Sequence, residues 1–152
     1  MSEQNIRVGV RFRTLTPAER ERGELECWAL DPDASLVQQL AIDASTAAAP
    51  TKAPLSFRFD NCFGPECDNK HIFSSMCKDI VHSATRGING SILAYGQTSS
   101  GKTYTMKGSE DEPGVLPLSL YQIFALIAAQ KDREFLLRVS YLEVYNEQVR
   151  AS

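Results

Sequence analysis

The feature that most constrains this chain is the glycine-rich segment Gly96-Gln-Thr-Ser-Ser-Gly-Lys-Thr103, which satisfies G-x-x-x-x-G-K-[ST] at every fixed position. The apolar run 91–95 precedes it, and residues 102–106 are expected to continue as a helix. This pattern is typical of a strand-to-helix turn whose backbone N–H groups surround phosphates. It predicts a P-loop inside an α/β sheet, with 91–95 as a strand buried on both faces.

Each residue type in this segment suits a triphosphate, which needs many donors converging on its oxygens. The two glycines allow the backbone to curl closely round the phosphates. Lys102 would place its ammonium on the β and γ phosphates, and the hydroxyl of Thr103 would hold Mg²⁺. Ser99 and Ser100 have no histidine placed in sequence to activate them, so we expect backbone donation from both. The expected phosphate-binding residues are Gly96, Gln97, Thr98, Ser99, Ser100, Gly101, Lys102 and Thr103.

Hydrophobic periodicity predicts strands before the P-loop and helices on both sides of it. Apolar and polar residues alternate over 6–12 and 56–60, and 25–30 is a further short strand. Apolar positions recur every four residues over 69–87, with Asp68 as N-cap, which predicts a helix. The segment 41–54 is rich in Ala, Thr and Pro and is expected to be an exposed loop.

Beyond the P-loop helix, the acidic segment 108–114 reads as a loop. A second helix is expected to begin near Leu116, and 135–145 reads as one long strand. The expected apolar face of the second helix consists of Leu120, Ile123, Phe124 and Ile127.

Composition and charge exclude several classes of protein. The net charge is −3 with both signs mixed and no basic run, which disfavours a nucleic-acid partner. The longest uncharged stretch, 116–129, is too short and too interrupted to span a bilayer. The first residues lack the layout of a secretory signal, which indicates the cytosol. A zinc site from Cys62, Cys67, His71 and Cys77 was weighed, but the spacing matches no common zinc module.

Several segments in a fixed order resemble the kinesin motor domain over essentially the whole chain. The resemblance implies an α/β P-loop NTPase with a kinesin-like central mixed sheet flanked by helices. Residues 108–111 and 132–141 look most like the centromere protein E type within that family. The segments that carry the resemblance are Ile6–Arg13, Phe59–Phe63, Asn89–Tyr95, Tyr95–Met106, Gly114–Pro117 and Val139–Glu147.

The resemblance also implies contacts with an adenine base. Arg11 and Arg13 lie where kinesins frame the adenine, and Tyr104 lies where a ring packs against it. Thr14 stands where the family usually has proline, so it joins the expected base-contacting residues with a looser fit. Leu118 replaces a usual arginine. A solvated strand face remains an alternative for the two arginines.

By resemblance the complete protein is a microtubule-stimulated ATPase, a motor that uses ATP and Mg²⁺ and has tubulin as its partner. Its expected location is the cytoplasm and the microtubule cytoskeleton, with the spindle or kinetochore as a narrower expectation. No membrane partner is expected. Dimerisation through a downstream coiled coil is compatible with the family, but residues 1–152 contain no heptad run.

Phosphoryl transfer needs a metal-anchoring aspartate, a group that positions water and γ-phosphate sensors. Kinesins place these in Asn-x-x-Ser-Ser-Arg-Ser-His and Asp-Leu-Ala-Gly-Ser-Glu, and neither motif occurs in residues 1–152. We therefore expect a partial motor domain, 1–152, that stops after the strand ending near Tyr145. It would lack both switches, the microtubule-binding helices and the neck. Such a chain would bind nucleotide at most and would not hydrolyse it alone.

Two other readings stay open at this point. One is a non-catalytic interaction module that keeps the P-loop, or a regulatory truncated kinesin. The other is a small P-loop kinase, which is disfavoured because such folds place the loop directly after their first strand, whereas 95 residues precede Gly96 here.

Overall fold

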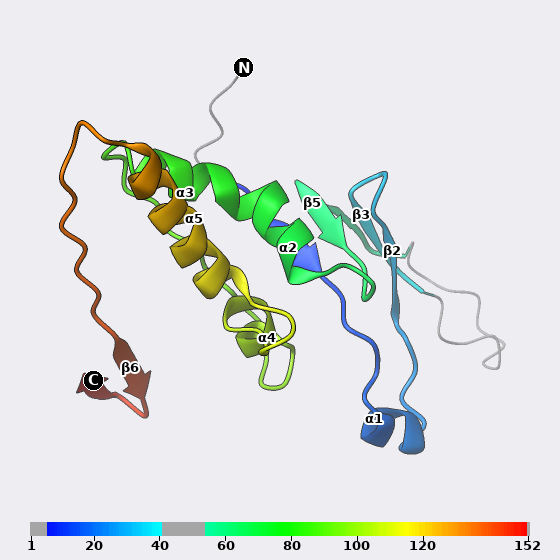
Figure 1. The fold of residues 1–152 in the computed structure, drawn as a ribbon. Helices are drawn as coiled ribbons and strands as arrows, with labels where there is room; N and C mark the ends of the chain where they lie inside the picture. The colour runs from blue at the N-terminus through cyan, green and yellow to red at the C-terminus, as the bar shows by residue number, and fades with distance from the viewer. Residues whose placement is uncertain (1–5, 41–53, 152) are drawn as a thin grey trace, which may run out of the picture.

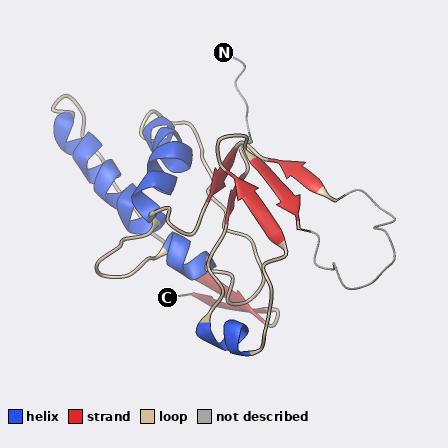
Figure 2. Cartoon of the chain, turned by 90° about the vertical axis from the view of Figure 1, so that its right-hand side faces the viewer, coloured by secondary structure: helices blue, strands red, loops and turns tan. Residues whose placement is uncertain are grey.

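The computed structural model describes residues 6–40 and 54–151. Its described part has mixed α/β composition. Among the described residues no helix combines the length and the apolar character needed to cross a bilayer. The elements are β1 (Gly9–Arg11), α1 (Pro17–Glu21), β2 (Trp28–Asp31), β3 (Leu36–Gln39), β4 (Ser56–Arg58), β5 (Asn61–Phe63), α2 (Asn69–Ile72), η1 (Phe73–Cys77), α3 (Lys78–Ala84), α4 (Lys102–Met106), α5 (Val115–Ala129), β6 (Leu142–Tyr145) and β7 (Gln148–Ala151). The helices α2, α3 and α5 lie between the strands β2, β3 and β5 on one side and β6 on the other (Figures 1 and 2).

The opening strand is confirmed in shortened form. β1 pairs in parallel with β5, with Val10 opposite Cys62, and the Phe12 amide donates to the Phe63 carbonyl at 2.8 Å. The strand β5 was not expected from the sequence, because its three residues are too few to show an alternating pattern. This pair carries Arg11 toward the helical layer, which is why it matters for the site.

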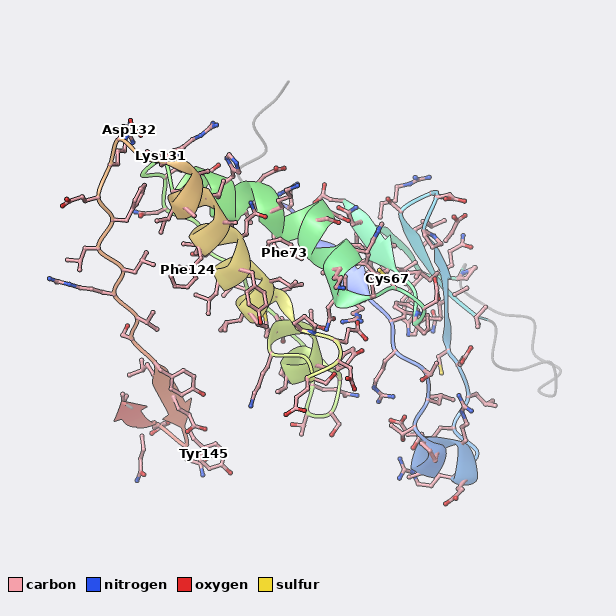
Figure 3. The ribbon with its side chains drawn as sticks, viewed as in Figure 1. Cys67, Phe73, Phe124, Lys131, Asp132 and Tyr145 are labelled. Atoms are coloured by element: carbon pink, nitrogen blue, oxygen red, sulfur yellow. The ribbon has the colours of Figure 1, made fainter. Side chains whose placement is uncertain are left out.

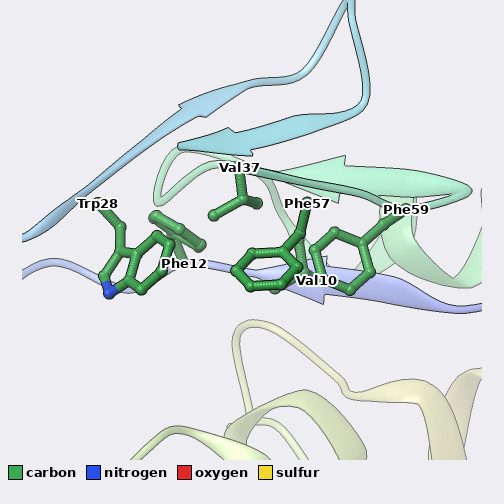
Figure 4. A pocket seen from close by; sticks show the side chains of 6 residues that line it. All are labelled: Val10, Phe12, Trp28, Val37, Phe57 and Phe59. Carbon is green, nitrogen blue, oxygen red and sulfur yellow. The ribbon is translucent and has the colours of Figure 1, made fainter. Parts of the chain in front are cut away.

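A second sheet of three antiparallel strands has the order β2-β3-β4. The expected strands near 25–30 and 56–60 are confirmed in shortened form, whereas β3 was missed because four residues of Leu-Val-Gln-Gln give little periodicity. The expected loop at 41–54 lies, except for Pro54, outside the described residues. An open apolar groove of about 280 Å³ separates this sheet from β1 (Figure 4). Its lining residues are Val10, Phe12, Trp28, Val37, Phe57 and Phe59.

The helix expected at 69–87 is confirmed over α2, η1 and α3, with a π-helical segment in its middle. Asp68 caps its first turn, because its Oδ1 accepts the His71 amide at 2.7 Å. The hydroxyls of Ser74 and Ser75 both donate to the His71 carbonyl, at 2.9 and 2.6 Å. These bonds compete with the regular backbone hydrogen bonds of the helix at the π-helical segment η1. The spacing of apolar residues in the sequence could not indicate this segment.

The core lies between this helix and α5, which run side by side in Figure 1. The expected inward face of α5 is only half correct. Ile123 packs against the core, but Leu120 is 39% and Phe124 57% exposed, and Phe124 projects on the side of α5 away from Phe73 (Figure 3). Because α5 is apolar around most of its circumference, the sequence pattern could not select a face. The buried cluster is Phe63, Ile72, Phe73, Cys77, Val81 and Val115.

Two predicted strands are wrong in whole or in part. Residues 91–95 form no strand, and Leu93 and Tyr95 are 91% and 102% exposed. Of the strand expected at 135–145, only β6 forms, paired with β7 through a turn in which Asn146 and Glu147 have positive φ. A strand exists only where another segment pairs with it, and the described residues place no strand beside 91–95 or 135–141.

Candidate functional site

The glycine-rich segment forms a tight loop that leads directly into α4. Gly101, the N-cap residue of that helix, has a φ of 99° and therefore adopts the left-handed conformation that favours glycine. A Cβ at Gly96 would lie 2.4 Å from the Ser100 hydroxyl oxygen, so a side chain at this position would clash with Ser100. Ser99 also has a positive φ, 66°, a strained state that recurs at functional sites. The expected strand-to-helix turn is thus a loop-to-helix turn, because residues 91–95 form no strand.

Lys102, the first residue of α4, folds back across this loop. Its ammonium donates to the Gly96 carbonyl at 2.8 Å and to the Gln97 carbonyl at 2.7 Å. An ammonium has three donors, so one remains for another acceptor. The lysine therefore holds a positive charge inside the curl of the loop, where the sequence analysis placed phosphates.

The other residues of the loop are exposed or half-buried. Gln97, Thr98 and Ser99 are exposed, and the Ser100 amide closes a turn onto the Gln97 carbonyl at 3.3 Å. Thr103, on the first turn of α4, is exposed. A hydroxyl beside a phosphate-binding loop suits Mg²⁺, which prefers oxygen ligands and shares them with phosphates. The described residues contain no group of three or more His, Cys, Asp or Glu that could hold a metal ion.

Arg13 is tied to the loop and to α1 and is not a freely solvated side chain. Its Nε donates to the Ser99 carbonyl at 3.1 Å, and its two Nη atoms donate to the Glu19 carboxylate at 2.7 and 2.6 Å. Glu19 also accepts the Thr16 amide at 2.7 Å, within the capping box of α1. Thr14 contributes only its carbonyl, which accepts from Arg13 at 2.9 Å.

Glu19 should therefore titrate at unusually low pH. The Arg13 hydrogen bonds, followed by those from Thr16, hold the pKa of Glu19 at about 2, below its ordinary 4.5. A carboxyl whose pKa is lowered on folding stabilises the fold above its ordinary pKa, and this contribution disappears as the pH falls through about 2. An NMR titration of the Glu19 side chain should show this midpoint, in the wild type and equally in a Glu21→Gln control. A midpoint near 4.5 would show that the Arg13 pair does not form in solution.

Arg11 turns inward from β1 into a polar cluster beside α4. Its guanidinium lies 5.1 Å from the centre of the Tyr104 ring, within the range of a cation–π contact. One Nη donates to Asn69 Oδ1 at 2.6 Å and to Thr105 Oγ1 at 3.0 Å, and the other donates to the Cys67 carbonyl at 2.9 Å. Arg11 and Tyr104, paired by the sequence analysis, are thus in contact.

Sequence reasoning missed Asn69 and Glu112, the residues that complete this cluster. Asn69 is fully buried, and its backbone N–H donates to Glu112 Oε1 at 2.8 Å. The Tyr104 hydroxyl donates to the other carboxylate oxygen of Glu112. This bond raises the pKa of Tyr104 and, with the Asn69 amide, holds the pKa of Glu112 below its usual range. In sequence, Asn69 is one more polar residue after a cap, and Glu112 one of three acids in a loop, so no pattern distinguished them.

Comparison with known sequences identifies what the chain is similar to. A family model described as Kinesin motor domain matches residues 11–151. Over 148 residues the chain is 43% identical to "Kinesin-like protein KIN-7G" of Oryza sativa subsp. japonica, covering 97% of this chain and 15% of that protein. It is 39% identical to "Kinesin-like protein KIN-7C, mitochondrial" of Arabidopsis thaliana, covering 95% of this chain and 15% of that protein. The chain therefore spans about a seventh of the length of these two curated relatives.

Comparison of structures agrees. The chain matches a solved structure described as "Structure of a fast kinesin: Implications for ATPase mechanism and interactions with microtubules", with a TM-score of 0.81 and 33% sequence identity. The match covers 96% of this chain and 40% of that one. The fold expected from the sequence, an α/β P-loop NTPase of this kind, is confirmed, although its strands are shorter and fewer here than the sequence indicated.

Proposed function

The chain belongs to the kinesin motor-domain family, and on that premise we propose that it is the ATP-binding part of a microtubule motor. Its proposed phosphate cradle is the loop from Gly96 to Thr103, with Lys102 on the phosphates and Thr103 on Mg²⁺. Arg11, Arg13, Thr14 and Tyr104 are the proposed base-side residues.

The observation that best supports this proposal is the Lys102 ammonium held inside the curl of the loop by two carbonyls. A side chain at position 96 would clash with Ser100, and Gly101 has the left-handed backbone that favours glycine, so both glycines of the motif are needed for this loop conformation. The ammonium keeps one donor for an anionic ligand, and the P-loop spacing, in which backbone N–H groups surround phosphates, indicates that this ligand is the phosphate chain of a nucleotide.

The activity of the complete protein follows as a proposal from its family. The complete motor domain would hydrolyse ATP with stimulation by microtubules, bind tubulin and act at the microtubule cytoskeleton of the cytoplasm. Residues 1–152 would supply nucleotide binding, while the metal-anchoring and water-positioning groups that hydrolysis requires would come from the rest of a motor domain. A role at the spindle or kinetochore is a narrower expectation.

The finer placement with the centromere protein E type stays a prediction without support from the relatives described above, whose names place them among plant KIN-7 proteins. That placement relied on two short segments, 108–111 and 132–141. One of these includes the start of a loop and the other an unpaired stretch, and such regions vary easily among homologues.

Calorimetric titration with ATP, with and without Mg²⁺, tests the proposed function. We expect one bound nucleotide per chain, with weaker binding when EDTA removes Mg²⁺. Thr103→Ala should abolish the Mg²⁺ dependence because it removes the hydroxyl ligand, whereas Thr103→Ser keeps the hydroxyl and should restore it. Wild-type chain that binds no ATP, or Mg²⁺ dependence that survives Thr103→Ala, would contradict the proposed roles.

A further inference from the structure

We propose that Asn69 and Glu112 are positioning residues of the nucleotide site, which fix Tyr104 and Arg11 as a platform for the planar base of a purine nucleotide. This inference rests on the proposed function and deepens it. Neither residue belongs to the P-loop, and both act through the side chains and backbone that they hold.

Asn69 is buried at the centre of the polar cluster. It is the one fully buried polar residue among those the structure describes, and every polar group of its side chain has a partner. Its Oδ1 accepts from Arg11 at 2.6 Å, and its Nδ2 donates to the Tyr104 carbonyl at 3.2 Å and to the Glu112 carbonyl at 3.5 Å. One side chain thus joins β1, α4 and the 108–114 loop.

Glu112 is rigidly placed. The loop around it is tightly folded: the Ser109 amide donates to the Glu112 carbonyl at 2.9 Å, and the Glu112 amide donates to the Ser109 hydroxyl at 3.1 Å. A Cβ at Gly108 would lie 2.2 Å from the Glu112 carbonyl oxygen, so this approach requires glycine. Both carboxylate oxygens of Glu112 are then used, one by the Asn69 amide and the other by the Tyr104 hydroxyl.

The Tyr104 ring is held at its edge and is partly open. Its hydroxyl is held by Glu112, Arg11 lies 5.1 Å from its centre, and 43% of the residue is still exposed. An aromatic ring fixed at its edge and partly open is a surface on which a heterocyclic base stacks, a contact worth about 1–3 kcal/mol. Tyr104 and Lys102 both lie on the short helix α4, which places the ring near the end of the loop that would hold the phosphates.

The predicted effect distinguishes the contribution of the base to binding from that of the phosphates. In Glu112→Gln one carboxylate oxygen becomes an NH₂ group, which can at most donate to the Tyr104 hydroxyl, so the charge-assisted bond that holds the ring is replaced by a weaker neutral one. We expect the Kd of Mg-ADP to rise about tenfold, a loss comparable to one base-stacking contact. The Kd of Mg-tripolyphosphate, which has no base, should stay within about twofold because the P-loop contacts remain.

The test measures both dissociation constants by competition against a fluorescent ADP analogue, with circular dichroism to verify the fold of each variant. Glu110→Gln is the matched control, since it removes the same charge from the same loop, and it should change neither constant. Tyr104→Phe keeps the ring but loses the Glu112 bond, and it should reproduce the selective loss for ADP.

The outcomes are distinguishable. Selective loss of ADP affinity in Glu112→Gln and Tyr104→Phe supports the positioning role. Unchanged affinities in both variants, or equal losses for ADP and tripolyphosphate, overturn it while the proposed nucleotide site stands. Wild-type chain that binds neither ligand overturns the nucleotide site itself and this inference with it.

Discussion

Replacing Lys102 with alanine should abolish the rise in melting temperature that Mg-ADP gives the wild-type chain. A ligand that binds only the folded state stabilises it by about 2.7 kcal/mol at about 100 times its Kd. For a chain of 152 residues this corresponds to a shift of roughly 5–10 °C. The Lys102 ammonium, 2.8 and 2.7 Å from two loop carbonyls, is the expected phosphate contact, and its loss should leave a shift near zero at the same ADP concentration.

The comparison is between shifts, because Lys102→Ala also removes two hydrogen bonds within the loop and can lower the melting temperature without nucleotide. Lys131→Ala serves as the control, since Lys131 lies just beyond the end of α5 (Figure 3) and should leave the ADP shift unchanged. Equal shifts in wild type and Lys102→Ala would show that Lys102 does not contribute to phosphate binding.

Truncating Phe73 should destabilise the fold far more than truncating Phe124. Phe73 is 7% exposed within the buried cluster, whereas Phe124 is 57% exposed on the open side of α5. Emptying a core site of a phenylalanine costs about 3–5 kcal/mol, because the loss of burial is combined with a cavity. The same change at a half-exposed site should cost less than about 1 kcal/mol.

Urea unfolding of Phe73→Ala and Phe124→Ala measures both effects, with an unchanged m-value showing that the comparison is one of stability. The two variants are matched in chemistry, but Phe73 lies in the core between the helices and Phe124 lies on the outer side of α5. Similar losses in both would mean that the outer face of α5 is buried in solution, as the sequence period had indicated.

The two predictions concern features that the sequence indicated to different extents. The P-loop motif could be recognised from the sequence, because its glycines, lysine and threonine lie within eight residues and their conformations depend on local interactions. The Asp68 cap and the helix that it begins were equally local. The inward face of α5 was not, since a helix that is apolar on nearly every side offers no period from which to choose.

The sequence alone determined the family, the glycine-rich loop and the helices on either side of it, because each depends on residues within a few positions of one another. Only the tertiary structure decided which strands pair, which face of α5 is buried, and that Asn69 and Glu112 meet Tyr104 and Arg11. Hydrogen bonds between segments 35 to 58 residues apart create that cluster. No local pattern records such contacts, because their energies depend on partners that folding brings together from distant positions.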